Sequence, residues 1–254
     1  MVSIDRVYQK VLALANKEQR GYITPQEFNL FADHAQKEIF EQYFYDLNQF
    51  RRLPGNNTVH SDPVDILEDK IANFEFWAVQ PNTIVSNQYG DINLTQFPNL
   101  YRLTEVMVNY GDGDGDGICE EVTLKEWRKY SRSPLTKHNR KRPVFMHYNY
   151  GYDRIKVYPF PPNTNNITNS YMTNGDDVKI SYIKKPTRPN WSYNVINDKP
   201  LYNSTNGVDF ELHASEETEL VYRILTLAGV AIEKPQLVQT AASLGAGQIQ
   251  QEKQ

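Results

Sequence analysis

The strongest periodic pattern in the chain lies between positions 24 and 50, where apolar residues recur at the three- and four-residue spacing of a helix. Thr24 suits the N-cap of this helix and Pro25 its first turn, and Glu27 is placed to close a capping box with Thr24. Aromatic residues widen the apolar stripe beyond one face. The pattern therefore predicts a long helix with two sides to bury.

Shorter helical patterns flank this segment. Residues 3–15 and residues 62–71 each predict a short helix. Helical spacing returns at residues 215–229, where Ser215 suits the N-cap and glutamates follow in the first turn. We expect this segment to cover one side of the long helix. A last, weaker helix is predicted over residues 237–251, which contain two glycines.

Between these helices the period of the pattern changes to two, which indicates strands. Val144 and Met146 alternate with Phe145, so they are expected on opposite faces of one strand. A helical turn is predicted near residues 122–130, and an irregular stretch after residue 186. The predicted strands are residues 74–76, 83–86, 100–110, 142–148, 154–158 and 178–184.

The order of these elements predicts an α+β protein. Residues 1–72 and 210–254 are expected to form a helical bundle. Residues 73–209 are expected to form an antiparallel β domain inserted between the two helical parts. The chain has no internal repeat that would favour a solenoid.

Composition narrows the class of protein. The chain has 254 residues and a net charge of −4, which argues against a general nucleic-acid binder. The 17 tyrosines and 11 phenylalanines favour sheets and interfaces rich in aromatic surface. The single cysteine, Cys119, cannot form an internal disulfide, which indicates synthesis in a reducing compartment. No apolar run has the length of a membrane span, and the amphipathic N-terminal segment lacks the pattern of a signal peptide.

One motif indicates a metal site. Asp112, Asp114 and Asp116 alternate with glycine, as at the start of an EF-hand loop, and carboxylate oxygens are the ligands that Ca²⁺ prefers. The twelfth position holds Thr123 in place of a bidentate glutamate, and a predicted strand rather than a helix precedes the loop. Two interpretations stay open: a calcium site at the three aspartates, or an acidic hairpin tip without a ligand.

A basic block follows the acidic motif. Its members are Arg128, Lys129, Arg132, Lys137, Arg140, Lys141 and Arg142. The block allows three interpretations: contact with phosphate groups, a solvated loop, or half of a head-to-tail subunit interface that includes the acidic residues 112–126. In the third case charge complementarity would set the register, and assembly would depend on salt.

The sequence carries no recognisable catalytic constellation. Its five histidines lack the spacing of metal ligands, and it has neither a nucleophile elbow nor a phosphate-binding loop. Glu41 with Asp46, and Glu216 with Glu217, come nearest to paired carboxylates. Their helical positions explain them better as a solvated face and as partners of a helix dipole. We therefore expect a protein that is not an enzyme and that needs no cofactor other than, in one interpretation, calcium.

Several segments together resemble a group of bacteriophage virion proteins. The group comprises small structural proteins of short-tailed phages, including crAss-like and marine phages. The layout of terminal helices around a β domain is also similar to that of the tail adaptors that form a ring beneath the portal. The resemblance spans nearly the whole chain and carries over no active site. The segments are ITPQEFNLFADHAQKEIFEQYFYDLNQF, residues 100–103, IKVYPFPP, ISYIKKP, FELHASEETELVYRILTLAGV and QIQQEKQ.

The resemblance implies a head-to-tail adaptor or neck-ring protein of the virion, made in the host cytoplasm. Its expected partners are copies of itself in a dodecameric ring, the portal protein, other tail or neck proteins and nearby genomic DNA, but no membrane. The competing interpretation is an aromatic-rich β module that binds a glycan or a receptor, with or without calcium. From the surplus aromatic surface of the long helix, we expect Phe40, Tyr43 and Phe44 to pack at a subunit boundary.

Overall fold

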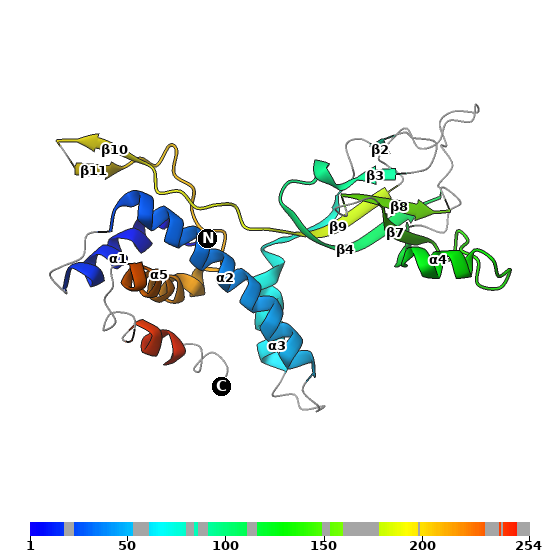
Figure 1. Ribbon diagram of the computed structural model, residues 1–254, viewed down its shortest axis with the longest axis horizontal. Coiled ribbons are helices and arrows are strands. Elements are labelled where there is room, and N and C mark those ends of the chain that lie inside the picture. The colour runs from blue at the N-terminus through cyan, green and yellow to red at the C-terminus, as the bar shows by residue number, and fades with distance from the viewer. Residues whose placement is uncertain are drawn as a thin grey trace. The chain divides into compact units, whose positions relative to one another are not determined.

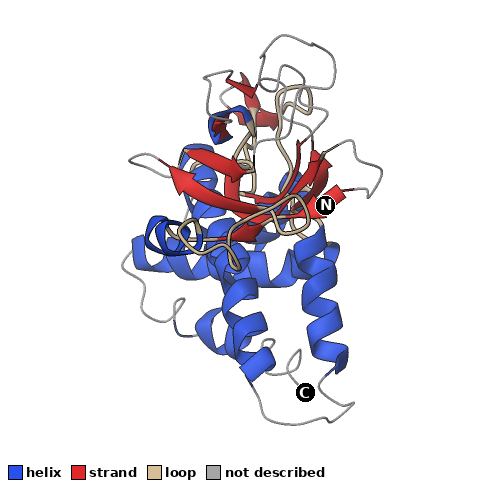
Figure 2. Cartoon of the chain, turned by 90° about the vertical axis from the view of Figure 1, so that its right-hand side faces the viewer, coloured by secondary structure: helices blue, strands red, loops and turns tan. Residues whose placement is uncertain are grey.

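The computed structural model describes residues 1–17, 23–52, 61–79, 84–85, 91–110, 116–148, 153–159, 178–197, 199–231, 239 and 241–247. These residues form helices and mainly antiparallel sheets, so the predicted α+β class is confirmed (Figures 1 and 2). The chain divides into a helical unit, Met1–Asn73 with Pro186–Gln254, and a β unit, Phe74–Lys185. Residues 186–209, which sequence analysis assigned to the β domain, therefore belong to the helical unit.

The helical unit is built on the long helix predicted from the sequence, α2 (Pro25–Arg52). Its capping box is formed, because the Thr24 N–H donates to Glu27 Oε2 (2.9 Å) and the Glu27 N–H donates to Thr24 Oγ1 (3.3 Å). The α5 helix packs against both α2 and α1, which confirms that it covers the long helix. The other helices of this unit are α1 (Ile4–Lys17), α3 (Ser61–Ala72) and α5 (Glu217–Ala231).

The start of α5 differs from the prediction. A 3-10 turn, η4 (Ala214–Glu216), precedes the helix. His213 rather than Ser215 caps this turn, because the His213 ring nitrogen Nδ1 accepts a hydrogen bond from the Ser215 N–H (3.3 Å). Residues 239 and 241–247 are helical within the region predicted for a last helix, and the rest of that region lies outside the described residues.

The aromatic surface of α2 is more completely covered than the sequence suggested. Phe40 is 3% exposed and Tyr43 is 4% exposed within the single chain. The expectation that these two residues pack at a subunit boundary is therefore wrong. The physical reason is that α2 packs against both α3 and α5. Phe44 is half-buried and meets Phe40 edge-on, with the ring centroids 5.1 Å apart.

A hairpin absent from the sequence prediction completes the helical unit. β10 (Tyr193–Ile196) pairs antiparallel with β11 (Lys199–Tyr202), where an irregular stretch was expected. Asn197, at the tight turn between them, has a φ of +50°, a conformation that asparagine tolerates better than most residues. The hairpin projects from the helices of its unit (Figure 1).

The β unit contains two sheets. The first has the order β1–β9–β4–β5, and all its pairs are antiparallel. The second has the order β2–β3–β8–β7–β6 and ends in a parallel pair, β6 with β7, so the wholly antiparallel domain that we expected is wrong at this edge. The strands are β1 (Glu75–Val79), β2 (Ile84–Val85), β3 (Asp91–Asn93), β4 (Leu100–Asn109), β5 (Asp116–Ile118), β6 (Glu120–Glu121), β7 (Val144–Tyr148), β8 (Arg154–Tyr158) and β9 (Val178–Lys184).

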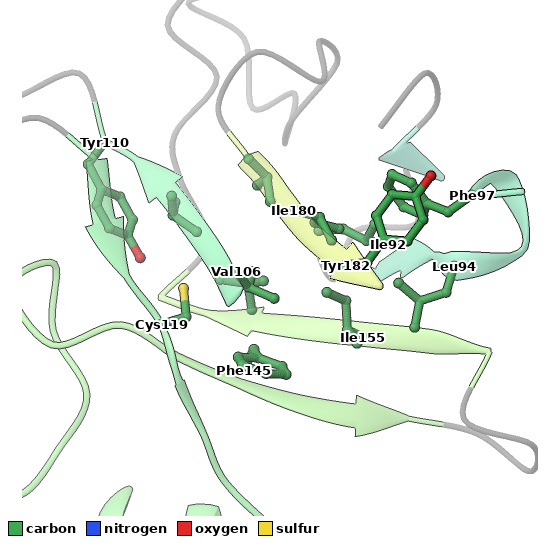
Figure 3. Close-up of a cluster of buried hydrophobic side chains, with 13 residues drawn as sticks. Ile92, Leu94, Phe97, Val106, Tyr110, Cys119, Phe145, Ile155, Ile180 and Tyr182 are labelled. Atoms are coloured by element: carbon green, nitrogen blue, oxygen red, sulfur yellow. The ribbon is translucent and has the colours of Figure 1, made fainter. Parts of the chain in front are cut away.

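Side chains from both sheets fill the main core of the β unit (Figure 3). Val106 from β4 and Ile180 from β9 meet Ile155 from β8 and Phe145 from β7. Cys119 is buried in the same core as a free thiol, and burial raises its pKa to about 12. The thiol is therefore packed as a small apolar group and is poorly suited to act as a nucleophile.

A smaller core lies on the other face of β7. Val144 and Met146 pack there with Trp127 of α4 (Leu124–Tyr130). The opposite faces predicted for these residues and Phe145 are therefore confirmed.

Candidate functional site

A cavity of about 430 Å³ lies in the helical unit between α2, α3, η4 and α5. One wall comes from α2, through Ile39, Tyr43, Asp46 and Phe50. These positions are separated by about one helical turn each, so they share one face of the helix. The wall is mainly apolar and aromatic, with one carboxylate.

The facing wall comes from α3. Leu67 and Lys70 are buried at this wall, whereas Ile66 and Asp69 are exposed. Ile66 and Asp69 are three residues apart and therefore neighbours on the helix surface. Asp69 makes no ion pair with a side chain in the described part of the chain, so the exposed side of this wall presents an apolar group beside a free negative charge.

A buried ion pair joins α3 to η4. Lys70 Nζ lies 2.7 Å from Glu216 Oε1, and Glu216 is 0% exposed. The ammonium also lies 5.7 Å from the centroid of the Tyr43 ring, within the range of a cation–π contact. The pair neutralises a carboxylate that would otherwise be costly to bury.

A second buried carboxylate belongs to Glu219 of α5. The Arg223 Nε donates to Glu219 Oε1 (2.7 Å), and the same guanidinium bonds Gln42 and Glu38 of α2. Burial raises the pKa of Glu219, the adjacent Glu216 raises it further, and Arg223 opposes both effects. Among the described residues no group donates to Glu216 Oε2.

The sequence placed Glu41 and Asp46 on a solvated helix face, and Glu216 and Glu217 at a helix N-terminus. Asp46 is instead 6% exposed, because the face of α2 that carries it lines the cavity. Glu216 does lie at the start of the α5 segment, in η4, but it is buried. Glu41 is exposed, as expected. Glu217 pairs with Lys10 of α1 across 2.6 Å, and hydrogen bonding to that lysine lowers its pKa. Lys70 was missed by the sequence analysis; its spacing three residues after the apolar Leu67 is the signal that could have indicated a buried lysine with an acidic partner.

The predicted calcium loop lies mostly outside the described residues, which exclude Asp112 and Asp114. The backbone of Asp116 begins β5 and pairs with Asn109 of β4. Within the described part of the chain, no group of three or more acidic, histidine or cysteine side chains is placed to hold a metal ion. Calcium binding at Asp112, Asp114 and Asp116 therefore stays a prediction.

The basic block is exposed along its length, from Arg128 in α4 to Arg142 before β7. A capping box between Thr123 and Glu126 starts the helix that carries its first members. Leu135, at the centre of the block, is 92% exposed. The roles proposed for the basic block, in phosphate contact or in subunit pairing, stay predictions.

The first sheet of the β unit exposes aromatic rings. Trp77 is 65% exposed, and Phe76 and Tyr101 are each 40% exposed. Lys184 Nζ lies 5.9 Å from the Phe76 ring centroid, and Lys185 Nζ lies 5.7 Å from that of Tyr101. These rings are the part of the β unit best suited to stacking on a ligand.

Comparisons with protein-family models and with curated protein sequences found no match for this chain. Among the described helices, none combines the length and apolarity needed to cross a membrane.

Because neither comparison found a match, the chemistry of the cavity itself indicates what the site can bind. Its apolar walls, neutralised interior charges and acidic edge suit the binding of an apolar group that carries a positive charge.

Proposed function

We propose that the protein is a structural component of a phage virion, a head-to-tail adaptor that assembles as a ring between the portal and the tail. The observation that carries this proposal is the rigidly mounted β10–β11 hairpin with an apolar tip. Resemblance to tail adaptors supplies the identity of the assembly. The formation of one unit from both chain ends, and of the other from the middle of the chain, supports the inserted-domain layout of such adaptors.

The base of the hairpin is firmly held. Trp191 is 2% exposed and stacks against Tyr193 and Tyr202, with ring centroids 5.7 and 5.8 Å away. Its indole Nε1 donates to Asp5 Oδ1 (3.0 Å), and its backbone N–H donates to Asn29 Oδ1 (2.8 Å). The hairpin is thereby fixed to α1 and α2.

The tip of the hairpin is apolar and exposed. Val195 is 64% exposed, Ile196 54% and Leu201 52%. A two-stranded hairpin has little stability of its own in water, and clustered exposed apolar residues mark interaction sites. A fixed base that presents an apolar tip is suited to contact with another protein.

The proposal is tested by coexpressing the chain with the portal protein of the same phage and imaging the purified particles by electron microscopy. We expect class averages in which this chain forms a closed ring on one face of the portal. A chain that neither joins the portal nor forms rings in its presence would rule the proposal out.

A second candidate function, ligand binding by the β unit, is favoured by the exposed rings of Phe76, Trp77 and Tyr101. Such rings stack on the faces of sugars. A glycan array probed with the wild type and with Trp77→Ala separates the two functions, because a Trp77-dependent signal would favour this second one. An equal, weak signal from both proteins would exclude it.

A further inference from the structure

We propose that the tip of the β10–β11 hairpin of one copy occupies the helical-unit cavity of a second copy. This inference rests on the proposed ring function and names the contact that joins its subunits. The cavity and the hairpin tip are complementary in charge and polarity, and they lie too far apart in one chain to meet.

The lining of the cavity suits an occupant that is apolar and positively charged. Its deepest carboxylates are already compensated, Glu216 by Lys70 and Glu219 by Arg223. Asp69 supplies an additional negative charge at the exposed edge, beside the apolar Ile66. The volume of about 430 Å³ lies in the range of about 300–1,000 Å³ found for cavities that receive a ligand-sized group.

The hairpin tip provides this combination. Ile196 lies opposite Lys199 in the ladder, and Asn194 lies opposite Leu201. Because cross-strand partners and alternate residues share a face, Ile196, Leu201 and Lys199 project from the same side of the hairpin. Two exposed aliphatic side chains therefore flank one exposed ammonium group.

The tip cannot reach the cavity of its own chain. The hairpin base is held at Asn29, whereas the cavity wall on α2 centres on Tyr43. Fourteen residues of helix span about 21 Å at a rise of about 1.5 Å per residue. Strands of four residues extend only about 13 Å. In Figure 1 the hairpin and α3 accordingly lie toward opposite ends of α2.

Because tip and cavity occupy different surfaces of one unit, their contact is heterologous. Each copy offers a tip to one neighbour and a cavity to the other. Repetition of such a contact closes into a ring when the rotation between copies allows it. A head-to-tail ring is the assembly that the proposed function requires.

Two defective variants test this arrangement. The tip variant, Ile196→Asp with Leu201→Asp, replaces the apolar side chains of the hairpin tip by charges. The cavity variant, Ile66→Lys with Asp69→Lys, makes the acidic edge of the cavity basic. All four positions are exposed, so both proteins should fold, which circular dichroism verifies. Neither variant alone should self-associate. Mixed together, they should form a dimer and nothing larger, because only one intact tip and one intact cavity are available.

A charge exchange sharpens the test. Lys199→Glu should weaken self-association about tenfold, and Asp69→Lys in the same chain should restore it. Leu30→Asp, at an exposed residue of α2 outside the cavity, is the matched control and should have no effect. Sedimentation velocity measures association of the free chains, and electron microscopy measures it on the portal.

The outcomes separate the two proposals. Rings on the portal that form equally well from the wild type, both defective variants and Lys199→Glu would overturn this contact and leave the adaptor function standing. A mixture of the defective variants that yields no dimer, free or on the portal, would also overturn it. Failure of the wild type to join the portal at all would overturn both proposals.

Discussion

At the scale of single residues, Lys70 controls the charge balance of the cavity. Lys70→Met removes the partner of Glu216, which is 0% exposed, and leaves a buried carboxylate without compensation. We expect the free energy of unfolding to fall by about 3–5 kcal/mol, measured by urea titration. Lys37→Met, which breaks an exposed pair with Asp33 in α2, should cost less than about 1 kcal/mol. Equal losses in the two variants would contradict the interpretation of the buried pair.

His138 provides a pH-dependent test in the β unit. Its ring stacks on Trp127, and burial, assisted by Lys137, lowers its pKa. The unfolded chain therefore takes up the proton first, near the ordinary histidine pKa of about 6.5. The contribution of His138 to stability is complete above that pH and is lost as the pH falls through the lower pKa of the folded state.

We expect the urea midpoint of the wild type to fall more steeply between about pH 7 and about pH 5 than that of His138→Gln. Identical slopes for the wild type and His138→Gln would show that burial of this ring does not affect protonation.

At the scale of elements, short-range sequence patterns predicted those helices and strands that are stabilised by contacts between residues close in the sequence. The capping box of Thr24 and Glu27 and the helical spacing after it were sufficient to predict α2. The β10–β11 hairpin was missed because Pro200 interrupts the strand pattern and because Trp191 supports it from outside. The cavity was missed for the same kind of reason, since its walls come from α2, α3 and α5, which are distant in the sequence.

The hairpin should therefore depend on Trp191 more than on its own strands. Trp191→Ala removes a side chain that is 2% exposed and also the hydrogen bond to Asp5. We expect a loss of about 3–5 kcal/mol in the free energy of unfolding. Trp77→Ala, at a residue that is 65% exposed, should stay within about 0.5 kcal/mol of the wild type. A small effect at Trp191 would show that the hairpin is held by other contacts.

At the scale of the whole molecule, the two units each contain their own buried core. Ile224 of α5 and Ile180 of β9 are both 0% exposed, one in each unit. Units with separate cores can unfold independently. We therefore expect two calorimetric transitions, with Ile224→Ala lowering the midpoint of one and Ile180→Ala that of the other.

Both variants lose the same side-chain atoms, and each Ile→Ala change in a core should cost about 2–5 kcal/mol. The substitutions themselves assign the transitions, because Ile224 lies in the helical unit and Ile180 in the β unit. If either substitution shifts both transitions equally, or if one transition accounts for the whole heat of unfolding, then the units are coupled. The hairpin and the cavity both belong to the helical unit. If the units unfold together, a subunit contact at either place would also stabilise the β unit. If they unfold independently, that contact would stabilise the helical unit alone.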